Sequence, residues 1–376
     1  MPELQFKGKE FVYNHHLSVP FRPLVPDASK SVGEPSLNGN LIIHGDNLHA
    51  LKALLPMYAG KVDCIFIDPP YNTGNEGWSY NDNVNSPMMK EWLSSNPVNA
   101  EDMLRHDKWC AMMWPRLNLL RELLSDSGTF WMTIDDNEVH RARMTLDEVF
   151  GERNFIASVC WQKKYAPAND KADFSAVHDY VICYAKNRVV DAAGKAVALL
   201  NRMERTDKQD RAYKNPDNDS RGPWKSGDYT CNKSAEERPN LYYPIEHPST
   251  KEQIWPKRTA VWRYTRERHQ KNVAQGRVWW GVNQENTVPS FKRFLSEVKG
   301  IVYGTWWTHE DVGHTDEAKK RLQEIFPDRE RSFDTPKPIG LLNRILEPVQ
   351  KLAKEPWKEY AGSFGADSVV SCTRVI

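Results

Sequence analysis

The sequence predicts an α/β fold in which a largely parallel sheet is covered by helices on both faces. A strand, a helix and a second strand are predicted within residues 41–68, an order and length typical of a βαβ unit. The second strand, VDCIFID (62–68), is almost continuously apolar, as expected for a strand buried on both faces. Three predicted strands also end in an aspartate, and ligands of open α/β sheets gather at the carboxyl ends of the strands.

The N-terminal part contains an arm and the βαβ unit. Residues 1–38 are polar and proline-rich, so they are predicted to form an extended arm. Residues 41–46 (LIIHGD) are predicted to form a short buried strand. Residues 47–58 place four leucines on one helical face, and Asp46 or Asn47 is suited to cap this helix.

The elements that follow continue the alternation of helices and strands. They are a helix over 114–128 closed by Ser-Asp-Ser-Gly, a strand over 129–135, a helix over 140–151 that stops at Gly151, and strands over 155–162 and 179–187. The alternation is lost between residues 190 and 325, and a final helix is predicted over 336–354.

Composition excludes several classes of protein. The 376 residues are 40% hydrophobic and 27% charged, as in folded globular proteins. No apolar run approaches the roughly 18 residues that a membrane span needs, and the N-terminus lacks the apolar stretch of a signal peptide. The six cysteines include no Cys-x-x-Cys pair, which argues against a metal site and a disulfide framework. The expected location is a reducing cytoplasm.

Residues 201–280 differ in composition from the rest of the chain. They contain 17 Lys and Arg against 11 Asp and Glu, although the net charge of the whole chain is only +1. Half of the 14 tryptophans lie between Trp224 and Trp307. This composition fits a surface for an anionic partner with flat rings, and it fits equally well a solvated face above a tryptophan-rich core.

Asp68, Pro69, Pro70 and Tyr71 are the strongest catalytic candidates. Proline fixes φ and has no N–H, so the carbonyls around it are rigidly aimed and free to accept hydrogen bonds. The Asp68 carboxylate is a second acceptor, and Tyr71 offers a flat ring face. Hydrogen bonds from the amino group of adenine to Asp68 and to the Pro69 carbonyl would make its nitrogen more nucleophilic toward a methyl group. A general base is the alternative role, although an ordinary carboxylate is too weak a base for a neutral amine.

If the planar amine is an adenine of a DNA duplex, it must first leave the base stack. Flipping costs a few kcal/mol, and stacking on Tyr71 would return roughly 1–3 kcal/mol of it. Phosphate contacts must supply the rest. The basic candidates for these contacts are Lys163, Lys164, Lys257, Arg258, Arg263, Arg266 and Arg268. For each one, a cation on a solvated face is the alternative.

IDPPYNTGNEGWSYND (67–82) resembles motif IV of the amino-methylating DNA methyltransferases, and the longer pattern is similar to the modification subunits of Type III restriction-modification systems. A bare DPPY occurs by chance, but five ordered segments between about residues 38 and 348 make the resemblance specific. The other four are LIIHGDNLHALKALLP (41–56), RHDKWCAMMWPRLNLLRELLSDSGTFWMTIDDNE (105–138), FIASVCWQKKYAPANDKADFSAVHDYVICYAKN (155–187) and SFDTPKPIGLLNRIL (332–346).

The resemblance implies a fold and a division of the chain. The fold is a Rossmann-like S-adenosylmethionine-dependent methyltransferase sheet with a circularly permuted motif order, interrupted by a mixed α+β target-recognition insertion. The parts are an N-terminal arm (1–38), a catalytic half (39–190), a target-recognition region (191–325) and the start of a cofactor-binding half (326–376).

The resemblance also implies an activity, a cofactor and partners. The activity is site-specific methylation of adenine N6 in the DNA of a bacterial or archaeal cell, with S-adenosylmethionine as the cofactor. Asp68, Lys337 and Pro338 would bind the cofactor, and Asp46 is a further candidate whose alternative role is to cap a helix. The partners would be double-stranded DNA, a restriction subunit with helicase and nuclease activity, and a second modification subunit. Methylation of cytosine N4 is an alternative, but enzymes of that kind more often have Ser in place of Asp68.

The sequence departs from the family pattern near its C-terminus. The family has a strand ending in Phe-x-Gly-x-Gly after the Lys337 motif, and close backbone approach to the cofactor needs those glycines. Here, YAGSFGADS (360–368) contains Gly362 and Gly365 at a different spacing. We expect a truncated chain or a divergent cofactor site. The functional alternative is an inactive DNA-binding remnant, or a half-protein whose cofactor site is completed by a partner.

Overall fold

The computed structural model describes residues 3–34, 41–74, 104–168, 172–327, 335–349 and 369–373. The chain forms two compact units, which we call unit 1 (Met1–Asn201 with Tyr303–Ile376) and unit 2 (Arg202–Val302). Unit 2 lies within the predicted target-recognition region, whose flanking parts, 191–201 and 303–325, belong to unit 1. None of the described helices is long and apolar enough to span a membrane.

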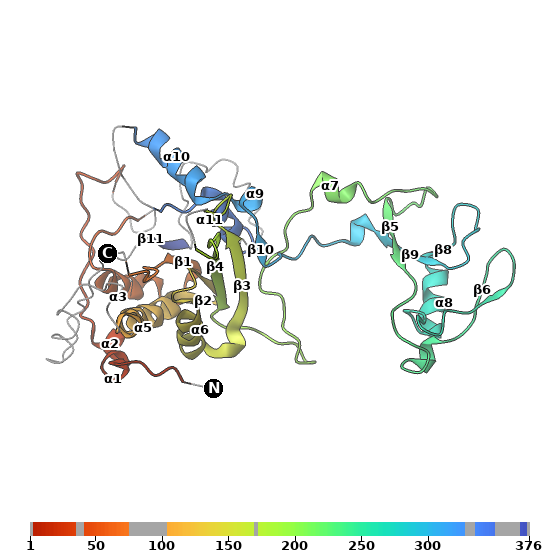
Figure 1. The fold of residues 1–376 in the computed structure, drawn as a ribbon, viewed down its shortest axis with the longest axis horizontal. Helices are drawn as coiled ribbons and strands as arrows, with labels where there is room; N and C mark the ends of the chain where they lie inside the picture. Colours follow the sequence, from red (N-terminus) through yellow and green to blue (C-terminus); the bar gives the residue numbers. More distant parts are fainter. Residues whose placement is uncertain are drawn as a thin grey trace. The chain divides into compact units, whose positions relative to one another are not determined.

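Unit 1 is built on a six-stranded sheet (Figure 1). Its strands are β1 (Val62–Asp68), β2 (Leu124–Ile134), β3 (Phe155–Gln162), β4 (His178–Ala185), β10 (Trp306–Trp307) and β11 (Val369–Thr373). They lie in the order β10-β3-β4-β2-β1-β11. Strand β1 is parallel to β2 and β11, and β10 is parallel to β3, whereas β4 is antiparallel to both of its neighbours. The predicted α/β fold is confirmed, with a sheet that is mixed on the β4 side.

Helices cover both faces of this sheet. The helices of unit 1 beyond the N-terminal segment are α3 (Asn47–Tyr58), α5 (Arg105–Leu123), α6 (Val139–Leu146), α9 (His309–Val312), α10 (Thr315–Ile325) and α11 (Ile339–Leu346). Ile65 and Ile67 of β1 belong to the core that includes residues of α3, α5 and α6, and Phe66 belongs to a second core with residues of α9 and α11. Each buried side chain of this size contributes about 1.5–3 kcal/mol. The run of apolar residues in β1 is therefore explained by burial on both faces of the sheet, as the sequence predicts.

Two predicted helix boundaries agree with the structure in part. Helix α6 continues as a π-helical turn (Asp147–Gly151) and a 3-10 turn (Glu152–Asn154), and Gly151 has a φ of 90°. Gly151 is thus the predicted stop. Helix α11 begins only after Pro338 and ends at Leu346, and the last residues of the predicted helix, 350–354, lie outside the described part.

The Ser-Asp-Ser-Gly segment (125–128), predicted to close a helix with a turn, is a bulge in β2. Helix α5 ends at Leu123, and β2 starts at once, with Val62 of β1 paired to Leu124 and Cys64 paired to Thr129. The intervening residues therefore bulge out of the ladder. A Cβ atom on Gly128 would lie 2.8 Å from the carbonyl oxygen of Val62, so this close strand approach requires glycine.

Two sequence predictions for the N-terminal part are wrong. Residues 41–46 form no strand: β2 and β11 already occupy both edges of β1, the second strand of the predicted βαβ unit, and Ile42 is fully exposed. Residues 3–19 are not an extended arm. They contain α1 (Lys9–Val12) and α2 (His15–Ser18), and Phe6, Val12 and Val19 are buried in the core with α5. Residues 20–34 contain no helix or strand, as their prolines predict.

Unit 2 is a small mixed unit with an aromatic core. Its elements are α7 (Asp207–Asp210), β5 (Trp224–Asp228), a 3-10 turn (Pro239–Leu241), β6 (Ile245–Glu246), β7 (Gln253–Ile254), α8 (Arg266–Ala274), β8 (Val278–Trp279), β9 (Ser290–Phe294) and a second 3-10 turn (Leu295–Glu297). Strands β5, β9 and β8 form one sheet and β6 pairs with β7. Tyr229, Tyr243, Trp262 and Trp280 form most of the core.

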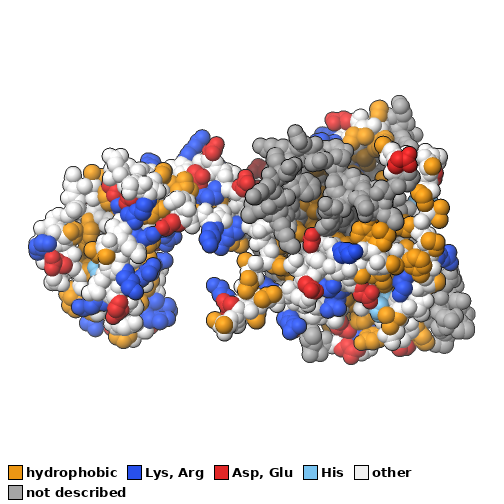
Figure 2. Space-filling view, turned by 180° about the vertical axis from the view of Figure 1, so that it is seen from behind, with side chains coloured by type: hydrophobic (Ala, Val, Ile, Leu, Met, Phe, Trp, Pro, Cys, Tyr) orange, Lys and Arg blue, Asp and Glu red, His pale blue; other side chains and the backbone are white. Residues whose placement is uncertain are grey.

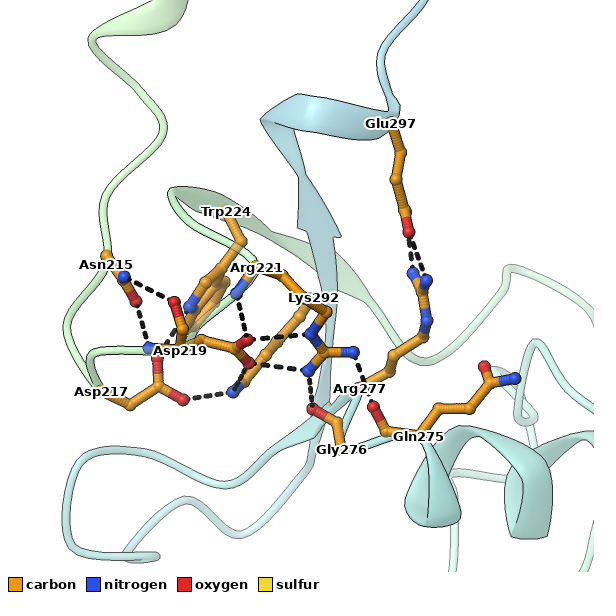
Figure 3. A network of polar contacts seen from close by, with 10 residues as sticks. All are labelled: Asn215, Asp217, Asp219, Arg221, Trp224, Gln275, Gly276, Arg277, Lys292 and Glu297. Carbon is orange, nitrogen blue, oxygen red and sulfur yellow. Dashed lines mark hydrogen bonds and ion pairs between the residues drawn. The ribbon is translucent and has the colours of Figure 1, made fainter.

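A charged network stabilises unit 2 (Figure 3). Lys292 of β9 is buried, and its Nζ atom bonds to Asp217 and, at 3.0 Å, to Asp219. Arg221 binds Asp219 with two nitrogens and donates to the carbonyl oxygens of Gln275 and Gly276 after α8. The network therefore joins the loop before β5, strand β9 and the end of α8. Hydrogen bonds between such charged groups are among the stronger ones in proteins.

Candidate functional site

The carboxylate of Asp68 lies at the carboxyl end of β1, between β2 and β11 in the sheet, and is bound on both oxygens. Thr133 Oγ1, on the adjacent parallel strand β2, donates to Oδ1 at 2.6 Å. Lys337 Nζ, in the segment before α11, binds Oδ2 at 2.6 Å. The side chains of Lys337 and Asp68 are only 9% and 12% exposed. The structure thus brings together two of the residues that the resemblance assigned to one site.

The three residues after Asp68 form a rigid corner. Pro69 is buried, and the carbonyl oxygen of Pro70 accepts a hydrogen bond of 2.7 Å from Trp109 Nε1 on α5. The Tyr71 ring packs against the core that includes α3 and α5. The ammonium of Lys337 lies 5.1 Å from the centroid of this ring, a distance typical of a cation–π contact. The carbonyls around the prolines were expected to be free to accept hydrogen bonds. The Pro70 carbonyl instead already accepts one from the Trp109 indole.

Burial and charge both act on Tyr71. Burial, followed by the negative charges of Asp68 and Asp179, raises the pKa of Tyr71 well above its ordinary value. The phenol is therefore neutral at physiological pH, and the ring offers an uncharged face. A neutral aromatic ring beside a carboxylate suits a planar amine and also suits a positively charged group.

A second acid–base pair lies near this corner. Asp179, the second residue of β4, is buried, and its Oδ1 atom binds Lys163 Nζ at 2.5 Å. Burial raises the pKa of Asp179 to about 6, and the charges of Lys163 and Lys337 partly oppose this increase. Lys163, predicted to contact DNA phosphate, is paired with Asp179 here, whereas Lys164 is exposed. Their phosphate contacts stay predictions.

Asp46 occupies the position of a helix cap. Its side chain accepts a hydrogen bond of 3.0 Å from the backbone N–H of His49, in the first turn of α3. The capping prediction is therefore confirmed, and a cap of this kind typically contributes about 1 kcal/mol. A role of Asp46 at the edge of a cofactor site stays a prediction. Pro338 likewise precedes a helix, as the N-cap residue of α11.

The predicted DNA-binding residues of unit 2 are exposed around an aromatic core. Lys257, Arg258, Arg263, Arg266 and Arg268 are all solvent-exposed, and Figure 2 shows Lys and Arg side chains over the visible face of this unit. Trp262, which stands among these cations in the sequence, is instead buried, and its Nε1 atom donates to the carbonyl of Tyr243 at 2.7 Å. Trp255, which precedes Lys257 in the sequence, is exposed.

Sequence reasoning missed three residues of the site. Thr133 donates to Asp68, the charge of Asp179 acts on Tyr71, and Trp109 fixes the Pro70 carbonyl. Thr133 could have been found, because a residue near the end of a strand parallel to β1 lies at the same edge as Asp68. No such signal marks Asp179, whose strand runs antiparallel to β2 and so brings its first residues to that edge. Among the described residues, no group of three or more His, Cys, Asp or Glu is placed to bind a metal ion.

The site geometry agrees with the matches to known proteins. The family model N6_N4_Mtase, described as DNA methylase, matches residues 62–351. The chain belongs to this DNA methylase family. It is 30% identical to the Type III restriction-modification enzyme StyLTI Mod subunit of Salmonella typhimurium, over 92% of this chain and 52% of that subunit. It is 26% identical to the EcoP15I Mod subunit of Escherichia coli, over 86% of this chain and 54% of that subunit.

These relatives confirm the resemblance to Type III modification subunits that the motifs predicted. The chain spans about half the length of both subunits. A shorter relative, the Type II methyltransferase M.KpnI of Klebsiella pneumoniae, is 28% identical over 86% of this chain and 75% of its own length. The matched range contains both Asp68 and Lys337, the two ends of the ion pair at the site.

Proposed function

We propose that this DNA methylase family member transfers a methyl group from S-adenosylmethionine to the N6 amino group of adenine in double-stranded DNA. One observation carries the proposal. Asp68 ends strand β1, and its carboxylate is held between a hydroxyl and an ammonium beside the face of Tyr71. An adenine amino group placed where the Lys337 ammonium lies would donate to Asp68, and its ring would lie close to Tyr71.

Each residue of the corner has a defined part in this proposal. Asp68 accepts a hydrogen from the amino group and favours a more tetrahedral nitrogen, which frees the lone pair for attack. Thr133 keeps the carboxylate in one orientation. Trp109 holds the Pro70 carbonyl, and with it the main chain that leads to Tyr71. Preorganised acceptors of this kind typically contribute about 10²–10³ in kcat.

The corner is compatible with the charge of the cofactor. It already holds a cation, the ammonium of Lys337, against a carboxylate and an aromatic ring. Bound S-adenosylmethionine would supply an electrophilic methyl group on a sulfonium, which is also cationic. Lys337, Pro338 and Asp46 are the described candidates for holding it. The candidate glycines 362 and 365 lie outside the described residues.

The central test is methyl transfer from tritiated S-adenosylmethionine to unmethylated duplex DNA, with the product nucleosides identified by mass spectrometry. We expect N6-methyladenine from the wild-type chain and a loss of at least 100-fold in kcat for Asp68→Ala. N4-methylcytosine as the product would identify the alternative substrate. Tyr71→Ala should lower kcat while duplex affinity stays unchanged, because the backbone contacts lie elsewhere. Loss of duplex binding by this variant would contradict that division of roles.

Calorimetric titration with S-adenosylmethionine separates the enzyme from a DNA-binding remnant. An enzyme should bind the cofactor without DNA. No heat of binding at millimolar cofactor would favour the remnant, or a chain whose cofactor site is completed by a partner. A restriction subunit and a second copy of the chain are the partners we propose, in the cytoplasm of a bacterial or archaeal cell. Their binding can be measured by sedimentation with the separate proteins.

We also propose that the exposed cations of unit 2 contact DNA phosphates. Each Arg or Lys that neutralises a phosphate adds about 0.9 to the slope of log K against log salt. Replacing Arg263, Arg266 and Arg268 by Gln should therefore lower the slope by about 2 to 3. Lys233→Gln is the matched control, because its ammonium is paired with Glu237 on the same unit. An unchanged slope in the triple variant would refute the assignment.

A further inference from the structure

A buried polar network lies next to the corner formed by Pro70 and Tyr71. Asn72 is buried and has a φ of 60°, in the left-handed region that few residues other than glycine adopt. Its Nδ2 atom donates to Oε1 of Glu138 and, at 3.2 Å, to the carbonyl oxygen of Arg105. Asparagine tolerates this backbone conformation better than most residues, but the conformation still needs support from its surroundings.

The support comes from a carboxyl group without solvent access. Glu138 is fully buried just before α6. Its Oε1 atom also contacts Nδ1 of His106, from the first turn of α5. The other oxygen, Oε2, accepts no hydrogen bond from the described residues and lies 3.8 Å from Arg141 Nη1. A buried carboxylate with one oxygen left unbonded is costly, and a proton on the carboxyl group removes most of that cost.

Near neutral pH, this proton is shared between the two titrating groups of the network, Glu138 and His106. Burial raises the pKa of Glu138 to about 7 and lowers the pKa of His106 to about 4. The imidazole is therefore neutral, and either Oε1 or Nδ1 donates to the other. The charged or titratable groups that face the pair are Arg141 on α6, Arg105, Asp107 and Cys110 on α5, and Asp135 after β2.

Helix α5 holds the corner on both sides of Tyr71. Trp109 binds the carbonyl of Pro70, the residue before Tyr71. His106, three positions earlier on the same helix, contacts the carboxyl group that binds Asn72, the residue after Tyr71. The backbone before and after Tyr71 is therefore fixed by hydrogen bonds. Of the two sides, only the Asn72 side depends on Glu138.

We propose that Glu138 is a positioning residue, which holds Asn72 in its left-handed turn, with His106 as its partner, and so places the Tyr71 ring for the target base. The catalytic part of this inference rests on the proposed function, whereas the structural part does not. Glu138 touches neither Asp68 nor the place of the reacting amine. Its effect is transmitted through Asn72 to the backbone of Tyr71.

The sign of the pH dependence follows from the raised pKa. A carboxyl group whose pKa is raised in the folded protein stabilises the fold fully below its ordinary pKa and loses this contribution as pH rises through the raised value. For Glu138 the loss begins near the ordinary pKa of 4.5 and is nearly complete at about pH 7. Above this pH the carboxylate is charged and its Oε2 atom still lacks a donor, so we expect the corner to loosen.

The first experiment follows the side-chain amide of Asn72, which binds Glu138, by NMR of the full chain with labelled asparagine, assigned with Asn72→Gly. The wild-type resonance should shift with a midpoint near pH 7, and Glu138→Gln should abolish this shift, because Gln cannot ionise. Glu148→Gln is the matched control: Glu148 binds Lys9 and Leu4, away from Asn72. A wild-type resonance that does not move between pH 5.5 and 8.5, or one that titrates identically in Glu138→Gln, would overturn the proposal.

The second experiment separates positioning from general stability. Glu138→Gln, which stays neutral, should flatten the pH profile of kcat for methyl transfer above pH 7, where the wild type should lose activity, while KM for duplex DNA changes less than 2-fold. An unchanged kcat and pH profile would overturn the catalytic part. If the wild-type chain methylates no DNA, the proposed function fails, and the NMR experiment alone decides whether Glu138 positions the corner.

Discussion

The ion pair between Lys337 and Asp68 allows a quantitative prediction. Replacing Lys337 by Met removes the ammonium 2.6 Å from Asp68 Oδ2, in a place where both side chains are almost buried. At that distance and an effective dielectric constant of about 20, the charges attract by about 6 kcal/mol, and the lost hydration of both ions offsets most of this attraction. Removing one partner of a buried pair typically costs about 3–5 kcal/mol. Because Thr133 still donates to Asp68, we expect about 3 kcal/mol.

A double-mutant cycle measures the pair itself. Lys337→Met and Asp68→Asn should each destabilise unit 1, and the double variant should lose about 2–3 kcal/mol less than the sum of the two. Hydrogen–deuterium exchange of peptides from β1, β2 and β4 reports on unit 1 alone. The control cycle is Lys233–Glu237, an exposed pair at 3.0 Å in unit 2, followed by exchange of peptides from β5 and β9, for which we expect about 0.3–0.5 kcal/mol. A coupling energy for Lys337 and Asp68 no larger than the control would refute the reasoning.

Three further predictions use the same exchange measurement. Gly128→Ala should destabilise unit 1 by about 1–3 kcal/mol, because its Cβ atom meets the Val62 carbonyl, whereas Gly304→Ala, with open space around its Cβ, should be neutral. Lys292→Met should destabilise unit 2 by about 3 kcal/mol and leave unit 1 unchanged. Asp179→Asn should flatten the pH dependence of unit 1, because the stability from protonated Asp179 is lost as pH rises through its pKa of about 6.

Local patterns predicted the elements that are buried or capped by their own residues. The apolar run 62–68 is β1, the leucines of 47–58 form α3 with Asp46 as its cap, and Gly151 ends the helical segment after α6. In each case the signal and its cause lie within a few residues. Residues 41–46 have a similar apolar start, but a strand also needs a free neighbouring edge, which a local pattern does not report.

The candidate site was predictable in its residues but only partly in its contacts. Asp68 was identified by its place at a strand end, and Lys337 only through the family resemblance. The two are 269 positions apart, and nothing local to either residue predicts a bond between them. Asn72 and Glu138 are polar residues whose burial depends on how α5 and α6 pack beside β1. Polar residues lie at the surface of most folded proteins, so the residue types alone could not predict burial at these positions.

The occupied carboxylate limits how a base can bind. Both oxygens of Asp68 already have donors, one from a hydroxyl and one from an ammonium. A charge-assisted hydrogen bond is roughly twice as strong as a neutral one, so an amino group of adenine cannot displace Lys337 without compensation from other contacts. Under the proposed function, base binding and movement of Lys337 are therefore a single coupled step. Lys337→Met should then bind a flipped base more readily, and 2-aminopurine fluorescence at the target position would measure this. Weaker or unchanged base flipping in this variant would show that Lys337 does not compete with the base for Asp68.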